Sequence, residues 1–144
     1  MYKHISGHSL IAFAIFALVT MSASAESLVD AVKREVNFES FDKSRLDDHL
    51  SIVVATAATR HFFSRADVES FHEDAKAKHE TYTTSNFKVI QLEETPKSRY
   101  ASITYSVDIN VPNNGEVNST HMIAHEIWER HLDHWYRLFA AMDN

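Results

Sequence analysis

The feature that most constrains the fold of this chain is a thirteen-residue segment, 99–111, in which apolar and polar residues alternate. Six apolar side chains share one face of it: Ala101, Ile103, Tyr105, Val107, Ile109 and Val111. A period of two predicts a long β-strand with one buried face. The strand runs into Asn114-Gly115, a pair that favours a tight hairpin because both residues accept a positive φ. We therefore expect an antiparallel strand to return from about Val117.

The next segment, 120–142, fits two structures. Its large apolar residues form a helical stripe: Ala124, Trp128, Leu132, Trp135, Phe139 and Met142. The alternative is a pair of antiparallel strands, which we favour because a hairpin turn starts the segment and Leu132-Asp133-His134 interrupts it. A helix would also leave the long alternating strand with too few neighbours. We expect the turn between these two strands at Asp133-His134.

The residues before the alternating strand combine helices with short strands. A serine is followed three residues later by an aspartate, as in a helix capping box, at three places: Ser27–Asp30, Ser44–Asp47 and Ser64–Asp67. They predict helices over 27–41 and 65–79, and one or two helical turns over 44–50. The β-branched run 52–56 predicts a strand between them, and 87–92 predicts another.

The first 25 residues have the three parts of a secretory signal peptide. Lys3 supplies a positive charge, Leu10 to Val19 form an uninterrupted apolar run, and Ala23-Ser24-Ala25 is a small-residue cleavage site. The run is too short to cross a bilayer, which takes roughly 20 apolar residues. We expect 1–25 to be removed, and 26–144 to form one secreted domain in the bacterial periplasm, without membrane attachment.

Composition narrows the classes of partner and cofactor. Cysteine is absent, so neither disulfides nor thiolate metal sites are available. The 14 Lys and Arg residues face 20 Asp and Glu residues, and this acidic balance argues against nucleic acid as a partner. Beyond the signal peptide Gly115 is the only glycine, which excludes glycine-rich phosphate loops. We expect no cofactor.

The histidines do not predict a metal site. His125-Glu126-Ile127-Trp128-Glu129 lacks the second histidine of a zinc-protease helix. His121 and His125 would share a metal on a helix, but on a strand they lie about 13 Å apart. We therefore expect no bound metal.

Three stretches resemble the nuclear transport factor 2-like superfamily, which includes ketosteroid isomerase-like and polyketide cyclase-like proteins. Ser64–Phe71 resembles the family's helix entry, and His125–Arg130 with Trp135–Phe139 resembles its paired last strands. The resemblance implies an α+β fold: a cone-shaped domain with N-terminal helices packed on a curved, mainly antiparallel sheet of four to six strands. Since this fold hosts enzymes, binding domains and assembly modules, it does not assign a function by itself.

In this fold the apolar face of the sheet closes over the helices to form a pocket. Carrying the strand register across both hairpins, with a four-residue last loop, predicts a mostly apolar lining with a few polar groups: Tyr105, Met122, Glu126, Trp128, Arg137 and Phe139. Glu126 and Arg137 would be diagonal neighbours, either orienting a ligand or simply pairing with each other. A register slip of one residue would instead line the pocket with the other face: His121, Ile123, His125 and Ile127.

These features favour a small-molecule-binding domain without catalysis, whose partner is a small apolar or amphipathic molecule. One alternative is a cofactor-independent isomerase, dehydratase or cyclase that uses Glu126 as its base. However, the isomerase pattern of a general-base aspartate with an oxyanion-stabilising Tyr/Asp pair cannot be aligned. A second alternative is an interaction module. The resemblance also implies a homodimer through the outer face of the sheet, where Ile123 and Ile127 would otherwise be exposed.

Overall fold

The computed structural model describes residues 25–56 and 59–143, so residues 1–24 of the predicted signal peptide lie outside the described residues. Two α-helices, one 3-10 turn and six strands follow in chain order: α1 (Leu28–Val36), η1 (Lys43–Arg45), β1 (Leu46–Ala55), β2 (Arg60–Ser64), α2 (Arg65–Ala77), β3 (Thr83–Glu93), β4 (Tyr100–Asn113), β5 (Glu116–His131) and β6 (His134–Asp143). Neither of the two described helices is both long and apolar enough to span a membrane.

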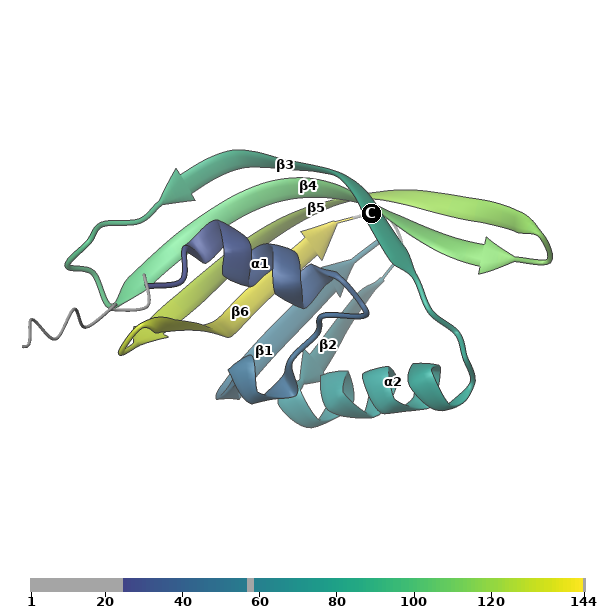
Figure 1. Cartoon of the computed structure of the whole chain (residues 1–144), viewed down its shortest axis with the longest axis horizontal. Helices are drawn as coiled ribbons and strands as arrows, with labels where there is room; N and C mark the ends of the chain where they lie inside the picture. Colours follow the sequence, from purple (N-terminus) through teal and green to yellow (C-terminus); the bar gives the residue numbers. More distant parts are fainter. Residues whose placement is uncertain (1–24, 57–58, 144) are drawn as a thin grey trace, which may run out of the picture.

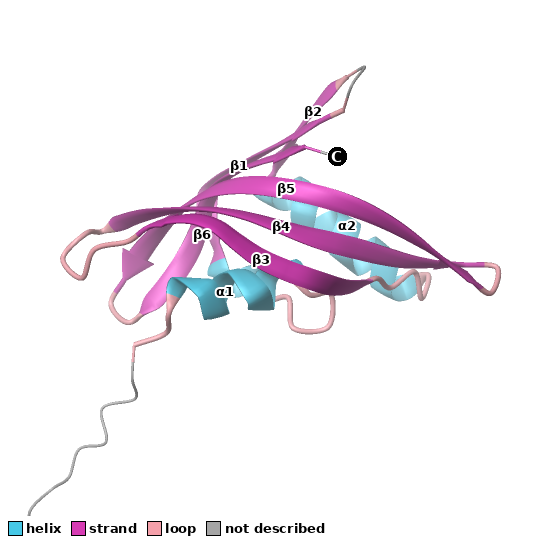
Figure 2. Ribbon diagram, turned by 90° about the horizontal axis from the view of Figure 1, so that it is seen from above, coloured by secondary structure: helices cyan, strands magenta, loops and turns pink. Residues whose placement is uncertain are grey.

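The six strands form one curved sheet in the order β2-β1-β6-β5-β4-β3. Neighbouring strands are antiparallel except β1 and β6, which are parallel. The sheet arches over α1, and α2 lies beneath β1 and β2 (Figure 1). Seen from above, β4 and β5 run the length of the molecule, and their hairpin extends past the other strands (Figure 2). The expected α+β fold, with helices on a curved and mainly antiparallel sheet, is confirmed.

The alternating segment forms β4, and the predicted hairpin follows it. Asn113 pairs with Glu116, and the two turn residues have positive φ values of 49° at Asn114 and 87° at Gly115. The segment 120–142 forms two strands rather than a helix, which confirms the favoured alternative. Its turn is Leu132-Asp133, one residue earlier than predicted, with a φ of 54° at Leu132.

Gly115→Ala tests whether backbone conformation governs this turn. A Cβ at this position would meet no atom within 4 Å, so crowding contributes nothing. The φ of 87° is nevertheless a conformation that L-residues rarely adopt. We expect the free energy of unfolding to fall by about 1 kcal/mol, as measured by urea denaturation. An unchanged midpoint would mean that the turn does not hold the hairpin.

The first part of the chain differs from expectation in three places. Helix α1 ends at Val36, because Asn37 is extended. The predicted helical turns over 44–50 shrink to η1, since Leu46 already begins strand β1, in which Leu50 is also buried. Strand β2 was not predicted, because all its residues are exposed and carry no alternation. In contrast, α2 begins at Ser64 with the predicted capping box.

The main core lies between α1 and the inner face of the sheet. Helix α1 buries one apolar side, including Leu28 and Val32, which are fully inaccessible. They belong to one cluster with the inner residues of β4 and with Trp128 and Trp135 of the last two strands.

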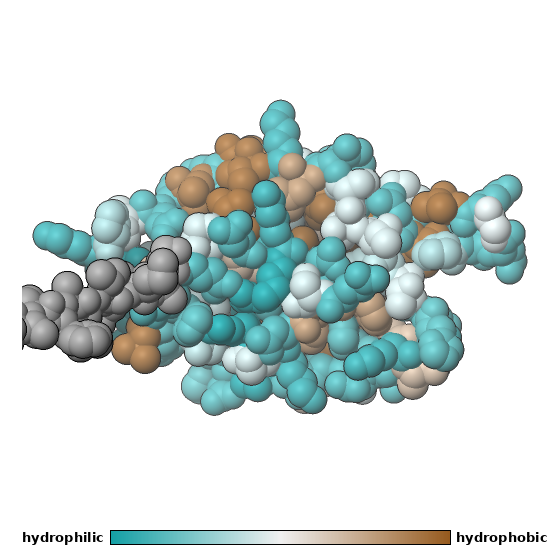
Figure 3. All heavy atoms as spheres, viewed as in Figure 1, coloured by the Kyte–Doolittle hydropathy of each residue, from teal (hydrophilic) through white to brown (hydrophobic). Residues whose placement is uncertain are grey.

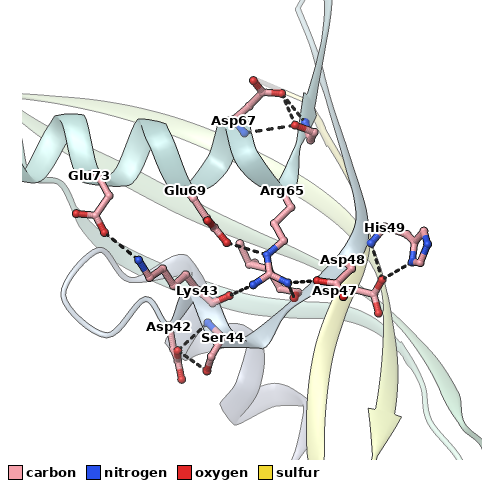
Figure 4. Close-up of polar contacts among 12 residues, drawn as sticks. Asp42, Lys43, Ser44, Asp47, Asp48, His49, Arg65, Asp67, Glu69 and Glu73 are labelled. Carbon is pink, nitrogen blue, oxygen red and sulfur yellow. Dashed lines mark hydrogen bonds and ion pairs between the residues drawn. The ribbon is translucent and has the colours of Figure 1, made fainter.

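A set of polar contacts holds the start of α2 against β1 (Figure 4). The Arg65 guanidinium pairs with Asp48 and with Glu69, the latter at 2.7 Å, and donates to the carbonyl oxygen of Leu46 at 3.0 Å. Further along the helix, Glu73 forms an exposed ion pair at 3.5 Å with Lys43 of η1. These contacts fix one edge of α2, while the side of the helix that carries Val68 and Phe71 borders a pocket.

Candidate functional site

A buried polar cluster lies on the inner face of the sheet and is built from neighbouring positions of β4, β5 and β6. Glu126 is fully inaccessible and accepts one hydrogen bond from Tyr105 Oη at 2.9 Å and one from Trp128 Nε1 at 2.7 Å. Its Oε1 also lies 3.4 Å from Arg137 Nη2, and the guanidinium stacks over the Trp128 ring at 5.2 Å. Burial, together with the Glu126 charge, holds the pKa of Tyr105 well above its usual range.

Arg137 lies immediately before a bulge in β6. Trp128 pairs with Arg137 and Ile127 pairs with Phe139, which leaves Leu138 as the extra residue. Arg137 is buried, yet its Nε and Nη2 atoms have no hydrogen-bond partner. Burial lowers the pKa of Arg137, but the charge of Glu126, together with Tyr105, Glu35 and Tyr82, outweighs this and keeps the pKa raised. The side chain is therefore a buried cation with donors to spare.

Glu35 of α1 is the second buried charge near this point. It is 2% exposed, receives Arg34 Nε at 3.0 Å on Oε1, and leaves Oε2 without a partner. Burial raises the pKa of Glu35 although Arg137 and Arg34 both act to lower it. Arg34 in turn pairs with Glu26, so a chain of alternating charges runs from the start of α1 into the sheet.

The raised pKa of Glu35 predicts a specific dependence of stability on pH. A carboxyl group whose pKa is raised on folding stabilises the protein fully below its unfolded value near 4.5, and this contribution is lost as pH rises through the folded pKa. We therefore expect wild type to lose stability relative to Glu35→Gln as pH rises from about 4.5, by up to about 1.4 kcal/mol per pH unit.

Urea denaturation of both proteins from pH 4 to 9 measures this difference. Carboxyl groups with lowered pKa, such as Asp42 and Asp67, act in the opposite direction but cancel between the two proteins. A difference that is flat with pH would show that folding does not raise the pKa of Glu35.

A pocket of about 280 Å³ opens between α2, β1 and β6, and Arg137 and Glu35 both border it. The rest of its lining is mostly apolar or aromatic: Phe41, Ile52, Val54, Phe63, Asp67, Val68, Phe71, His72, Tyr82 and Met142. Since Phe71 is 66% exposed whereas Arg137 is buried, the phenylalanine marks the mouth and the guanidinium marks the floor. Burial also raises the pKa of Tyr82, which keeps its hydroxyl protonated.

The residues predicted for the pocket lie in four different places. Arg137 borders it, whereas Tyr105, Glu126 and Trp128 are sealed in the cluster behind it and Met122 packs against the main core. The placement of Phe139 on the same face as Arg137 is wrong.

The bulge at Leu138 accounts for that error. After it, Phe139 pairs with Ser51 and Ile127 on the outer side, while Ala140 and Met142 take the inner positions. A simple alternation through β6 could not anticipate the extra residue. The alternative lining, His121, Ile123, His125 and Ile127, lies on the outer face of β5.

Sequence reasoning missed most of the true lining, which comes from α1, the loops and α2. Glu35 falls on the buried side of α1, four residues after Ala31 and three after Val32, and a carboxylate in that stripe was the available signal. His72 is held between the rings of Phe38 and Phe41, each 4.5 Å away, and no local sequence pattern shows that contact.

Within the described residues, one group has its ligand atoms close enough together for a metal ion: Asp47, Glu129 and His131. Glu129 is already engaged by Arg99 at 2.5 Å and by His131 at 2.9 Å. The group is therefore accounted for by ion pairing, and nothing else points a ligand to it.

No family model matches the sequence, and no curated protein resembles it in sequence. Solved structures share its fold. The β subunit of benzoate 1,2-dioxygenase from Burkholderia mallei is 10% identical with a TM-score of 0.60, over 81% of this chain and 89% of that one. A ketosteroid isomerase-like protein from Erwinia carotovora is 7% identical with a TM-score of 0.54, over 78% and 85%.

A nuclear transport factor 2-like protein of unknown function in nutrient uptake, from Rhodospirillum rubrum, is 13% identical with a TM-score of 0.52, over 80% and 90%. At such identities the likeness establishes the fold alone. The chain therefore has the nuclear transport factor 2-like fold that the resemblance of its sequence implied.

Proposed function

We propose that this chain binds a small amphipathic molecule, without transforming it, in the pocket between α2, β1 and β6. One observation carries the proposal: the buried guanidinium of Arg137 borders a hollow whose walls are mostly apolar, and its Nε has no partner while its Nη2 has only the 3.4 Å ion pair with Glu126. Buried donors without partners are rare and costly, and a ligand that accepts from them recovers that cost. Apolar walls with a few converging polar groups are typical of small-molecule sites.

Sequestration of Glu126 favours binding over catalysis. A general base must come within hydrogen-bond reach of the proton that it removes. Both carboxylate oxygens of Glu126 already accept hydrogen bonds, and the residue does not border the pocket. The carboxylate that an acid–base enzyme would use is therefore not the one expected from the sequence.

A titration with N-phenyl-1-naphthylamine, an uncharged apolar fluorophore, tests the binding proposal. We expect saturable binding with one molecule per chain and an increase in fluorescence, since the pocket offers aromatic walls such as Phe41. Fluorescence that rises linearly without saturation would overturn the proposal.

Glu35 supports the alternative of a cofactor-independent isomerase, dehydratase or cyclase. It borders the pocket, its Oε2 is unpartnered, and its pKa is raised by burial toward the range of a working acid–base group. Exchange of the α-protons of 2-heptanone in D2O, followed by NMR, tests this function. The enzyme would be favoured if wild type exchanges these protons above background and Glu35→Gln does not. The variant must still bind N-phenyl-1-naphthylamine with wild-type affinity.

We further propose that the domain works in the periplasm as a homodimer, joined through the outer face of the sheet. Ile123 is 43% exposed there, and it lies on the same face as Ile127, His121 and His125. Burying apolar side chains of this kind stabilises an interface. We expect sedimentation equilibrium of residues 26–144 at micromolar concentration to give twice the chain mass, and a single-chain mass would contradict it.

A further inference from the structure

The pocket does not end at the residues of its mouth. A second hollow, of about 460 Å³, lies between the C-terminal half of α2, the loop after it and the hairpin of β4 and β5. Phe71 and Tyr82 line both hollows, so the two lie side by side and have these two side chains as a common border. The rest of the second lining comes from the helix, its loop and the hairpin: Ala75, His79, Glu80, Thr81, Val111, Pro112, Asn113 and Asn118.

We propose that both hollows hold one elongated ligand: a straight alkyl chain that carries an uncharged hydrogen-bond acceptor, such as a hydroxyl or carbonyl oxygen, at one end. The polar head lies at Arg137, and the chain passes Phe71 and Tyr82 to reach Val111. This inference rests on the proposed binding function and names the class of molecule for it.

The shape of the ligand follows from the position of the two hollows on either side of Phe71 and Tyr82. A compact molecule would fill the first hollow and leave the apolar side chains of the second in contact with water. Val111 is 44% exposed on the inner side of the hairpin, and Figure 3 shows hydrophobic atoms on this protruding part of the molecule. A flexible chain covers such a surface in proportion to its length, since each buried methylene contributes separately.

The charge of the head follows from the ion pairs behind the pocket. Two guanidinium groups, Arg34 and Arg137, stand among three carboxyl groups, Glu26, Glu35 and Glu126. The cation at the pocket floor is therefore already compensated, and an anionic head would add one more negative charge to a buried group of residues. A neutral acceptor can take a hydrogen bond from Arg137, whose Nε has no partner, without that cost.

Displacement of N-phenyl-1-naphthylamine by primary alkanols from 1-hexanol to 1-dodecanol tests the shape. Each added methylene is expected to tighten binding about three- to fourfold until the second hollow is filled. 1-Octanesulfonate, which is permanently anionic, tests the head and is expected to bind at least about tenfold more weakly than 1-octanol. Tighter binding of the sulfonate would overturn the neutral head.

A matched pair of variants locates the chain. Val111→Glu places a charge in the second hollow, whereas Val117→Glu makes the same change at an exposed position that pairs with Pro112 and does not line it. We expect Val111→Glu to abolish the gain from 1-octanol to 1-dodecanol while 1-hexanol binds as in wild type, and Val117→Glu to change neither.

The outcomes separate this inference from the function on which it rests. If the fluorophore and 1-hexanol bind but affinity does not increase with chain length, the elongated ligand is wrong and the pocket stands. The elongated ligand is also wrong if the affinity of Val111→Glu for alkanols still increases with chain length. If neither the fluorophore nor any alkanol binds, the proposed function itself fails.

Discussion

Glu126→Ala is expected to lower the free energy of unfolding by about 3–5 kcal/mol, because it leaves the buried Arg137 cation without its partner. The same change removes the acceptor of Tyr105 Oη and of Trp128 Nε1, both of which are inaccessible to water. Urea denaturation followed by circular dichroism at pH 7 measures the loss.

The double variant Glu126→Ala/Arg137→Met separates charge from packing. Removing the cation as well eliminates the uncompensated charge, so the double variant is expected to be more stable than Glu126→Ala alone, although the unsatisfied donors still cost about 1–3 kcal/mol each. Glu116→Ala, at an exposed position of the same strand, is expected to change nothing measurable. If Glu126→Ala cost less than about 1 kcal/mol, the cluster would not be an ion pair sealed from water.

Val68→Trp is expected to weaken binding of N-phenyl-1-naphthylamine about a hundredfold or more, because an indole ring on this side of α2 displaces the space of three to four methylene groups. Val68 is partly buried and borders the pocket between helix and sheet. The first hollow then cannot accept a ligand, while the sealed cluster around Glu126 is untouched.

Ser70→Trp is the matched control for this change. It lies two residues further along the same helix, is exposed and does not line the pocket. We expect Ser70→Trp to bind the fluorophore as wild type does, and both variants to unfold within about 1 kcal/mol of wild type. Equal affinities in Val68→Trp and wild type would place the fluorophore elsewhere on the molecule.

The pairing of β4 with β5 and of β5 with β6 could be predicted because local sequence signals specify it. The alternation of 99–111 and the Asn114-Gly115 turn fix the register of β4 against β5, so Tyr105 faces Ala124 as that register requires. Glu126 and Arg137 likewise meet as diagonal neighbours. Period and turn chemistry are sufficient for β4 and β5, which a tight hairpin joins in continuous register.

The pocket could not be predicted in the same way, because its walls come from segments far apart in the chain. The bulge at Leu138 places Phe139 on the opposite face of the sheet, and no residue near Leu138 predicts a bulge there. The sheet side of the pocket depends on the parallel pairing of β1 with β6, which brings Val54 beside Met142. Such pairing is specified by tertiary packing rather than by local propensity.

Native mass spectrometry of the protein, purified from the cells that produce it, tests the central proposal most directly. We expect wild type to carry one extra small organic mass per chain, and Val68→Trp to carry none. A bare wild-type spectrum, or the same extra mass on both proteins, would contradict a ligand bound at the floor formed by Arg137.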